Sequence, residues 1–268
     1  MKKTAFISGG SRGIGRSIAL KLAENGYNIA VIGKTDTPHP KLEGTIHEVV
    51  EAVKAIGGNA IAIKADIREE EMVKNAVEKT IETFGSIDVL INCASAINLT
   101  DIDETEMKRY DLMFDINVRG TFMVSKYCLP YLRKGQNPHI INMSPPLPIE
   151  NFWYGRHLAY TMSKTAMSLI VVGLADQLKE DGIAVNALWP KTAVSTAAIS
   201  NKLGNSLTEH SRTTEIMSDA AWAIISQNSR EVTGKFFIDE DILRSQGETN
   251  FDKYAINPSK ELAPDLFI

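Results

Sequence analysis

The stretch Ser8-Gly9-Gly10-Ser11-Arg12-Gly13-Ile14-Gly15 lies between a short β-type run, 3–8, and an apolar helical pattern that ends near Asn25-Gly26. An Asn-Gly pair is a favourable helix C-terminus. Bare glycines let a backbone approach a pyrophosphate closely, and the N-terminus of the following helix presents free N–H groups to it. The spacing, Gly9-x3-Gly13-x-Gly15, differs from the common G-x-G-x-x-G. Strand, glycine turn and helix together predict a phosphate-binding loop.

Beyond this loop, short β-type runs continue to alternate with helical patterns. The expected strands are 3–8, 28–32, 60–64, 89–92, 139–142, 183–188 and 235–238, and the later helices are 45–56, 69–84, 107–132, 159–178 and 215–226. This order predicts an α/β fold with a Rossmann-type, doubly wound, mainly parallel seven-stranded sheet and helices on both faces. We expect one domain over 1–268, with an extended C-terminal tail from about residue 240. A mobile loop with a short helix is expected over 191–213.

Composition and charge narrow the function classes. Of 268 residues, 44% are hydrophobic and 23% charged, as in ordinary globular proteins. A net charge of −4 predicts no basic surface for nucleic acid or acidic lipid. No apolar run reaches the roughly 18 residues of a membrane span, and Met1-Lys2-Lys3 is followed too soon by glycines for a secretory signal. Cys93 and Cys128 make neither a disulfide framework nor a four-ligand metal site. We expect a cytoplasmic, metal-free protein without a membrane span.

The end of the strand 28–32 bears on cofactor choice. In dinucleotide-binding folds an acid here binds the ribose hydroxyls, whereas a basic group accommodates the 2′-phosphate of NADP. The sequence has Lys34 and no acid at the strand tip, and Arg12 adds a second positive charge. This pattern favours NADP(H). Asp36, 21 residues past Gly15, keeps NAD(H) possible, and Lys34 could equally be a solvated loop lysine.

Polar or small residues follow several other strand ends. Ligands of doubly wound sheets bind beyond the carboxyl ends of the strands. Asp66 would contact adenine there, or would cap the helix 69–84. Asn92 leads into the small residues 93–95, which allow close approach to a ligand, and Ser144 and Trp189-Pro190 follow later strands. Their agreement places one ligand site along this edge of the sheet.

Tyr160 and Lys164 lie four residues apart in the helical pattern 159–178 and therefore share one helix face. A free phenol has a pKa of about 10, and a nearby ammonium favours the phenolate. The pair is therefore suited to general acid–base chemistry on a carbonyl or alcohol. The alternative is an exposed tyrosine with an incidental lysine. Asn117, a polar amide in an apolar helical run, is a further candidate for function or for a hydrogen-bond network.

Taken in order along the chain, these motifs resemble the short-chain dehydrogenase/reductase family over almost the whole length. The motifs that carry the resemblance are Ser8-Gly9 to Gly15, Asp66-Ile67, Asn92-Cys93-Ala94, Asn117-Val118, Tyr160-x3-Lys164 and Val185-Asn186-Ala187 before Pro190. The segments 38–42, 144–147, 187–193 and 250–252 are most similar to the branch of hydroxysteroid dehydrogenase-like proteins of type two. Larger members of that branch add a sterol-carrier domain and a peroxisomal signal, which we do not expect here.

The resemblance implies hydride transfer between a nicotinamide and a carbonyl carbon, with Tyr160 passing the proton. Lys164 would lower the pKa of Tyr160 and hold the nicotinamide ribose, and Asn117 would anchor a water leading protons to Lys164. The helix of Tyr160 and its neighbour would form the contact of a homodimer or homotetramer. The implied cofactor-binding residues are Gly9, Ser11, Arg12, Gly13, Ile14, Gly15, Lys34, Asp66, Ile67, Asn92, Ala94, Tyr160, Lys164, Pro190 and Thr192.

The sequence departs from the family where a serine normally orients the substrate oxygen. That position is Pro145, which has no donor, and Ser144 lies sixteen residues before Tyr160, a longer gap than usual. Either the turn at Pro145 re-aims Ser144 into the site, or the serine's role is lost or passed to another group. Lys191 stands where the family often has glycine, and would reach a phosphate or acidic substrate or remain a solvated lysine.

Trp153, Tyr154 and Trp189 are candidate substrate contacts near the expected site mouth. With the loop 191–213 they would form an apolar wall or lid, or they would serve in packing or a subunit contact. The leading hypothesis is an NADP(H)-dependent oxidoreductase acting on the carbonyl or alcohol of an apolar, steroid- or fatty-acyl-like molecule. The alternatives are an NADP-binding protein with little turnover, because of Pro145, and an enone or double-bond reductase on the same scaffold.

Overall fold

A computed structural model of the chain describes residues 2–38, 43–196 and 205–268. Seven strands form one sheet in the order β3-β2-β1-β4-β5-β6-β7, and every neighbouring pair is parallel. The predicted doubly wound sheet is therefore confirmed. The strands are β1 (Thr4–Ser8), β2 (Asn28–Gly33), β3 (Asn59–Lys64), β4 (Val89–Asn92), β5 (His139–Asn142), β6 (Ala184–Trp189) and β7 (Phe236–Ile238).

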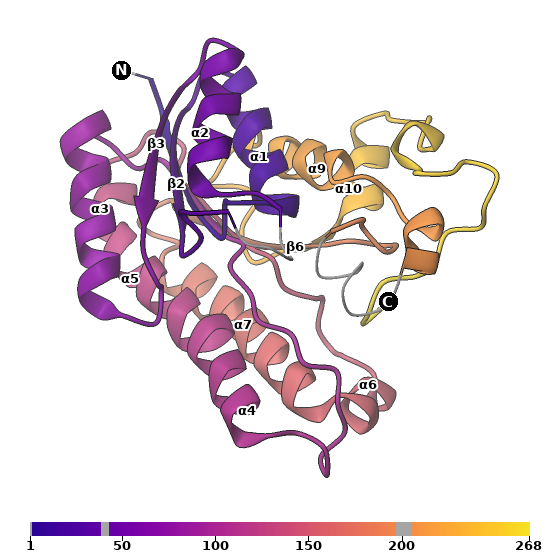
Figure 1. Ribbon diagram of the computed structural model, residues 1–268. Helices are drawn as coiled ribbons and strands as arrows, with labels where there is room; N and C mark the ends of the chain where they lie inside the picture. The colour runs from indigo at the N-terminus through magenta and orange to yellow at the C-terminus, as the bar shows by residue number, and fades with distance from the viewer. Residues whose placement is uncertain (1, 39–42, 197–204) are drawn as a thin grey trace.

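Helices cover both faces of the sheet, as Figure 1 shows. Because successive strand residues point to opposite faces, Ile7 packs into one hydrophobic core and Phe6 into the other. The first core contains residues of α1 (Gly13–Glu24), α2 (Ile46–Ala55), α9 (Glu215–Ile225) and α10 (Asp239–Ser245). The second contains residues of α3 (Glu70–Phe84), α5 (Thr121–Leu132) and α7 (Leu158–Gln177).

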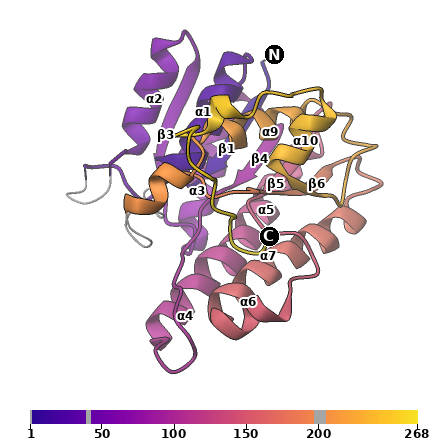
Figure 2. The same ribbon diagram turned by 90° about the vertical axis from the view of Figure 1, so that its right-hand side faces the viewer.

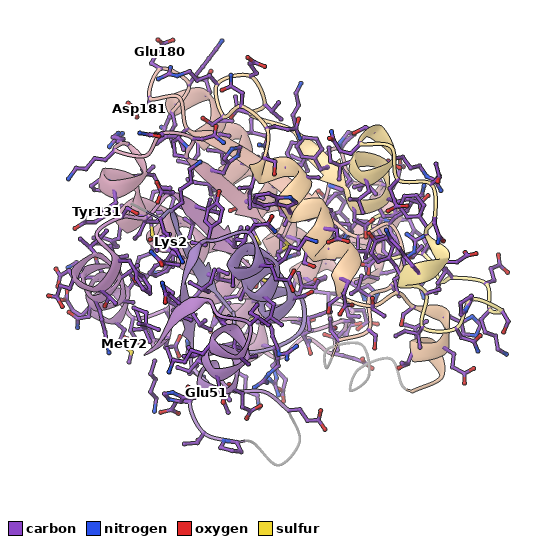
Figure 3. The ribbon with its side chains drawn as sticks, turned by 90° about the horizontal axis from the view of Figure 1, so that it is seen from above. Lys2, Glu51, Met72, Tyr131, Glu180 and Asp181 are labelled. Atoms are coloured by element: carbon purple, nitrogen blue, oxygen red, sulfur yellow. The ribbon has the colours of Figure 1, made fainter. Side chains whose placement is uncertain are left out.

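All strands run the same way, so their carboxyl ends meet along one edge of the sheet. Lys2, Glu180 and Asp181, which precede β1 and β6, lie at the surface in the view from above (Figure 3). The C-terminal residues approach the sheet near α6 (Asn151–Arg156) and α7, as the turned view shows (Figure 2). The chain end therefore returns toward the helix that carries the Tyr160–Lys164 pair.

Three predicted segments differ in detail from the structure. The helix expected over 107–132 divides into α4 (Met107–Met113), a π-helical segment η1 (Phe114–Gly120) and α5. The tail expected to be extended from about residue 240 begins with helix α10 and contains a 3₁₀ turn η3 (Asp252–Tyr254). Three acidic residues in its first turn favour α10. The short helix expected in 191–213 appears as a 3₁₀ turn, η2 (Asn205–His210), whereas 197–204 lie outside the described residues.

The helix α7 is apolar and long enough to span a membrane by length and composition alone. Half of its most apolar 18-residue window is buried inside the protein. Val171 and Leu174 of α7 belong to the core that packs against the sheet. The apolar residues on the buried half of α7 are therefore accounted for by packing against the sheet.

The glycine turn brings three parts of the backbone together. Gly9 has a φ of 72°, and a Cβ atom placed on it would lie 2.5 Å from the backbone nitrogen of Ala94. A Cβ on Gly15 would lie 2.4 Å from the carbonyl oxygen of Gly9. Real side chains do not tolerate such distances, so only glycine lets β1, α1 and the loop after β4 approach this closely.

We predict that Gly9→Ala will lower the free energy of unfolding more than Gly26→Ala. Both positions have positive φ, which costs an L-residue about 1–2 kcal/mol. Nothing lies within 4 Å of a Cβ on Gly26, whereas Gly9→Ala must also displace the backbone of Ala94, at a further cost of about 1–3 kcal/mol. Denaturant unfolding of both variants measures this difference. Equal losses would contradict the close-approach argument.

Candidate active site

A cavity of about 470 Å³ runs over the carboxyl ends of the strands from the glycine turn to α7. It brings together most of the residues predicted from the sequence. Lining it are Gly9, Ser11, Arg12, Gly13, Ile14, Lys34, Asp66, Ile67, Ala94, Tyr160, Lys164, Trp189 and Pro190. The other predicted site residues do not contribute to the lining: Gly15, Asn92, Asn117, Ser144, Trp153, Tyr154 and Thr192.

The end of the cavity at β2 carries an excess of positive charge. Lys34 is 68% exposed and reaches Asp66 only at 3.7 Å. Arg68 binds both carboxylate oxygens of Asp66, at 2.9 and 2.6 Å, and this contact holds the pKa of Asp66 below its usual range. Asp36 pairs with Lys64 at 2.9 Å and does not line the cavity. The acids near this end are therefore already neutralised, whereas Arg12 and Lys34 still face the cavity.

Asp66 does not cap the helix α3, contrary to one of the two readings of its position. The N-cap residue is Glu69, and Asp66 instead accepts the backbone N–H and the guanidinium of Arg68. Arg12 donates from Nη2 to the carbonyl oxygen of Gly44 at 2.7 Å. This bond fixes the Arg12 side chain at the entrance to the glycine turn, where sequence reasoning placed it.

Tyr160 and Lys164 lie in the first three turns of α7 and line the opposite end of the cavity. Lys164 is 2% exposed; its Nζ donates to the carbonyl oxygen of Met143 at 2.6 Å and lies 5.1 Å above the ring of Trp189. Burial lowers the pKa of Lys164 to about 8. An amine that is poised near neutrality inside a cavity is a common feature of functional sites.

The pKa of Tyr160 moves in the direction opposite to the sequence expectation. Burial raises it above its ordinary value, and the nearby carboxyl of Asp265 raises it further. Tyr160 is only 5% exposed, and its ring stacks on Phe267 with centroids 5.8 Å apart. In this state the phenol keeps its proton, which suits a proton donor more than a base.

Asn117 lies in the π-helical segment, a type of helix distortion frequent at functional sites. Its Oδ1 accepts from the Ala96 N–H at 2.8 Å and from Ser95, and its Nδ2 donates to the Ala96 carbonyl and to Ser163. The side chain thus ties the loop after β4 to α7. The amide is occupied by these four bonds, so a water would have to be held by other atoms of this segment.

Ser144 is fully buried, and its Oγ has no hydrogen-bond partner within the described parts of the chain. It does not line the cavity, although the preceding Met143 does. Ser168 donates to the carbonyl oxygen of Pro145 at 2.7 Å, which fixes the turn on the α7 side. Ser144 is therefore a buried residue beside the cavity that does not contribute to its lining.

An aromatic cluster covers the Tyr160 end. Phe267 lies 5.5 Å from Trp153, 5.8 Å from Tyr160 and 5.7 Å from Trp189, measured between ring centroids. The Nε1 of Trp189 donates to the carbonyl oxygen of Leu266 at 2.7 Å. Tyr154 bonds Thr165 through its hydroxyl and packs beside the cluster. Trp153 and Tyr154 thus pack against this aromatic cluster without lining the cavity.

The C-terminal segment was not anticipated as part of the site. Pro264, Asp265 and Leu266 line the cavity beside Tyr160. The segment carries no periodic pattern or motif, so its sequence gives no signal of where it folds back. Only the composition, an acid between apolar residues, hints that this part of the tail is not simply solvated.

Lys191 points away from the cavity, which corrects the expectation that it reaches a substrate phosphate. Its Nζ pairs with Glu240 at 3.0 Å and with Asp241 at 3.5 Å. Glu240 also binds Arg212 at 2.6 Å and Arg244 at 2.8 Å. Burial opposes ionisation of Glu240, but hydrogen bonds from these three cations outweigh it and lower its pKa to about 2. Glu240 thereby joins the loop after β6 to α10.

The fold and the site can now be compared with known proteins. Residues 3–204 match the family of short chain dehydrogenases. That match covers most of the chain, and the glycine turn, Asn117, Tyr160 and Lys164 all fall within it. The chain belongs to the short-chain dehydrogenase/reductase family.

Individual members of the family are similar over nearly the whole chain. The sequence is 49% identical over 265 residues to hydroxysteroid dehydrogenase-like protein 2 of Danio rerio, and equally to that of Homo sapiens. These alignments cover 99% of this chain but only 63% of each relative. A crystal structure from Xanthomonas campestris, described as that of a "putative dehydrogenase", is 46% identical, with a TM-score of 0.96 over 99% of this chain and 97% of that one.

A more distant short-chain dehydrogenase bears on the cofactor class. Carveol dehydrogenase from Mycobacterium avium, solved in complex with NAD, is 25% identical with a TM-score of 0.76. The alignment covers 88% of this chain and 95% of that one. A member of the family with the same fold thus binds NAD.

We predict that Glu240→Gln will lower the free energy of unfolding by about 3–5 kcal/mol at neutral pH, because it removes a buried partner of three cations. The depressed pKa means that this stabilisation is complete above about pH 5 and is lost as the pH falls toward 2. The difference between wild type and variant should therefore shrink over that range. Asp241→Asn is the control: Asp241 is 62% exposed, so its loss should cost less than about 0.5 kcal/mol. A pH-independent difference would contradict the assignment.

Proposed function

We propose that this short-chain dehydrogenase is an NADP(H)-dependent oxidoreductase that interconverts a carbonyl and an alcohol on an apolar small molecule. The observation that carries the proposal is that Tyr160 and Lys164 line the same cavity as the glycine turn. A proton-transfer group and a phosphate-binding loop thus face one continuous space. Such an arrangement suits a reaction between a bound dinucleotide and a carbonyl.

The residues present fit a nicotinamide dinucleotide. Gly9 and Gly13 line the cavity and present bare backbone to it. Thr192, between the lining residues Pro190 and Ala193, has a buried Oγ1 without a hydrogen-bond partner among the described residues, which leaves a hydroxyl available near the Pro190 end. Gly9 to Gly15 would hold the pyrophosphate, and Lys164 and Pro190 the nicotinamide half. When bound, the cofactor supplies or accepts the hydride.

The preference for NADP(H) is argued from charge. Arg12 and Lys34 line the β2 end of the cavity, and the exposed Lys34 ammonium is free to move. Asp36, the acid that would favour the ribose hydroxyls of NAD, is engaged by Lys64. Two cations without a free acid suit a 2′-phosphate. The NAD complex of carveol dehydrogenase shows that NAD(H) is the alternative within the family.

The substrate class is argued from the wall around Tyr160. Ile97, Leu99 and Trp189 line this part of the cavity together with Leu266, so most of the surface offered to a ligand is apolar. A wall of this kind suits a steroid-like or fatty-acyl-like carbonyl compound, which gains free energy by leaving water. The name of the relatives, hydroxysteroid dehydrogenase-like protein 2, is consistent with that class.

The proposal includes assembly as a homodimer or homotetramer in the cytoplasm. The helices α5 and α7 leave Phe122, Leu169 and Val172 about half exposed, at 56%, 56% and 49%. Large apolar side chains on neighbouring elements are typical of subunit contacts. No nucleic-acid partner is proposed, because the net charge is −4.

A second candidate is an NADP-binding protein with little or no turnover. It is favoured by one observation, that Ser144 is buried outside the cavity lining and leaves the usual serine position without a donor. A double-bond reductase, which needs no such donor, is a third candidate that the missing serine donor favours. Calorimetric titration with NADPH and NADH, followed by an NADPH-oxidation screen of ketones, aldehydes and enones with product analysis, separates the three. Tight NADPH binding without turnover of any compound would favour the binding protein.

We predict that Tyr160→Phe will lower turnover by at least about 100-fold, because only the proton donor is removed. NADPH affinity should stay within about threefold of wild type, or about 0.6 kcal/mol. Steady-state NADPH oxidation and calorimetric titration on the same preparations measure both quantities. Tyr127→Phe, on α5, is the matched control and should leave turnover unchanged. Undiminished activity in Tyr160→Phe would contradict the assigned role.

We predict that Lys34→Asp combined with Arg12→Ala will lower NADPH affinity by about 10- to 100-fold and leave NADH affinity nearly unchanged. The physical reason is the loss of two charge-assisted contacts, which solvent around the exposed Lys34 weakens to a combined contribution of about 1.4–2.7 kcal/mol. Calorimetric titration with each cofactor measures the change. Lys2→Asp, at an exposed residue that precedes β1, controls for net charge. An unaltered preference would place recognition of the 2′-phosphate elsewhere.

A further inference from the structure

Among the described residues that line the Tyr160 end of the cavity, no serine is free to act as a second hydrogen-bond donor to a carbonyl oxygen. Pro145 has no side-chain donor, and Ser144 is fully buried and does not line the cavity. Other polar groups at this end are committed: Ser95 donates to Asn117, and the Trp189 N–H donates to Leu266. A developing negative charge on oxygen is stabilised most by preorganised hydrogen-bond donors. The question is which group supplies the second donor.

The C-terminal segment places a carboxyl group at this end. Pro264 forms an antiparallel bridge with Thr192, the Ala193 N–H donates to Ala263 at 2.9 Å, and the Asp265 N–H donates to Lys191 at 3.2 Å. On its far side the segment is held by the Trp189–Leu266 bond and by the stacking of Phe267 on Tyr160. Asp265 is therefore fixed between two anchored neighbours and lines the cavity.

Two titratable groups act on Asp265: Lys164 on α7 attracts its carboxylate form, and Asp239 at the start of α10 repels it. The charge of Asp265 in turn raises the pKa of Tyr160. Burial raises the pKa of Asp265 to about 7, although one oxygen accepts the Leu266 N–H at 2.7 Å. A carboxyl kept protonated near neutrality by its surroundings is a hydrogen-bond donor, as in other enzyme sites that polarise a carbonyl.

We propose that Asp265 is a further catalytic residue, whose protonated carboxyl donates a hydrogen bond to the same substrate oxygen that Tyr160 protonates. This assignment rests on the proposed carbonyl-reductase function. Asp265 keeps its proton throughout, and the proton that ends on the alcohol oxygen comes from the phenol of Tyr160. The carboxyl takes the place of the serine that Pro145 removes, so the site contains two donors again.

The test uses the full chain and compares wild type with Asp265→Asn, Asp265→Ala and Glu261→Gln. Asparagine keeps a donor but cannot ionise, alanine removes the donor, and Glu261 is an exposed acid of the same segment that serves as the control. NADPH oxidation is followed from pH 5.5 to 9 with decanal, or with another carbonyl compound of the screen that is reduced faster. In parallel, wild type carrying ¹³C-carboxyl aspartate is titrated by NMR, with Asp265→Asn identifying the resonance.

Asp265→Ala should lower kcat/KM at pH 6 by about 100-fold, the typical effect of removing one oxyanion donor. In wild type kcat/KM should fall above about pH 7, where the carboxyl ionises, and the NMR resonance should titrate in the same range. Asp265→Asn should retain most of the rate and lose that fall; Lys164, whose pKa is about 8, would still produce a later one. Glu261→Gln should behave as wild type.

Distinct results overturn distinct claims. If wild type reduces carbonyl compounds and Asp265→Ala reduces them equally well, or if Asp265 titrates below pH 5, the catalytic role of Asp265 is wrong while the proposed function stands. If wild type binds NADPH and reduces no compound of the screen, the proposed function fails and the role of Asp265 fails with it. A fall with its midpoint near pH 7 that persists unshifted in Asp265→Asn assigns that ionisation to another group and also overturns the proposal.

Discussion

The close packing of backbone against backbone at the glycine turn is the constraint on which the rest of the site depends. Gly9 and Gly10 both donate to the carbonyl oxygen of Ile32, at 2.9 and 3.2 Å, and the Cys93 N–H donates to Ser8. These bonds hold the ends of β2, β1 and β4 together at the place where the chain switches from one half of the sheet to the other. The switch opens a crevice between the two halves. A side chain at Gly9 or Gly15 would collide with neighbouring backbone, so the strand ends at the base of the crevice would have to move apart.

The other end of the cavity depends on burial. Lys164 and Tyr160 are almost inaccessible, and removing each from water shifts its pKa toward the neutral form. An amine can be buried only if its N–H groups find acceptors, and the Met143 carbonyl supplies one. That carbonyl belongs to the segment after β5, so the position of Lys164 is set by the same sheet edge as the glycine turn. The carboxyl-terminal edge of the sheet thus positions both ends of the cavity.

The sequence predicted the sheet, the helices on both faces and most of the cavity lining because these follow from local signals. Hydrophobic periodicity identifies strands and helices, and a parallel sheet brings strand ends together whatever the loops do. The burial of Ser144 outside the cavity lining and the pairing of Lys191 with Glu240 could not be predicted. Each depends on contacts between residues many positions apart, for which a single sequence carries no periodic signal.

The position of the C-terminal segment is the clearest case of a contact that a single sequence does not predict. Nothing near Asp265 resembles a motif, and the expectation of an extended tail missed α10 as well. The position of the tail depends on Glu240, because this one carboxylate holds Lys191 and Arg212, which stand on either side of the loop after β6. With that loop fixed, the backbone of 191–193 offers an edge to which 263–265 can bond.

The same edge contact gives two results at once. It inserts Phe267 among Trp153, Tyr160 and Trp189, which excludes water from the phenol, and it brings the Asp265 carboxyl into the space that remains. Exclusion of water raises the pKa of both acids and strengthens any hydrogen bond that they make to a substrate oxygen. Solvent exclusion around Tyr160 and the position of the Asp265 carboxyl beside it are therefore consequences of a single packing arrangement, the return of the chain end across β6.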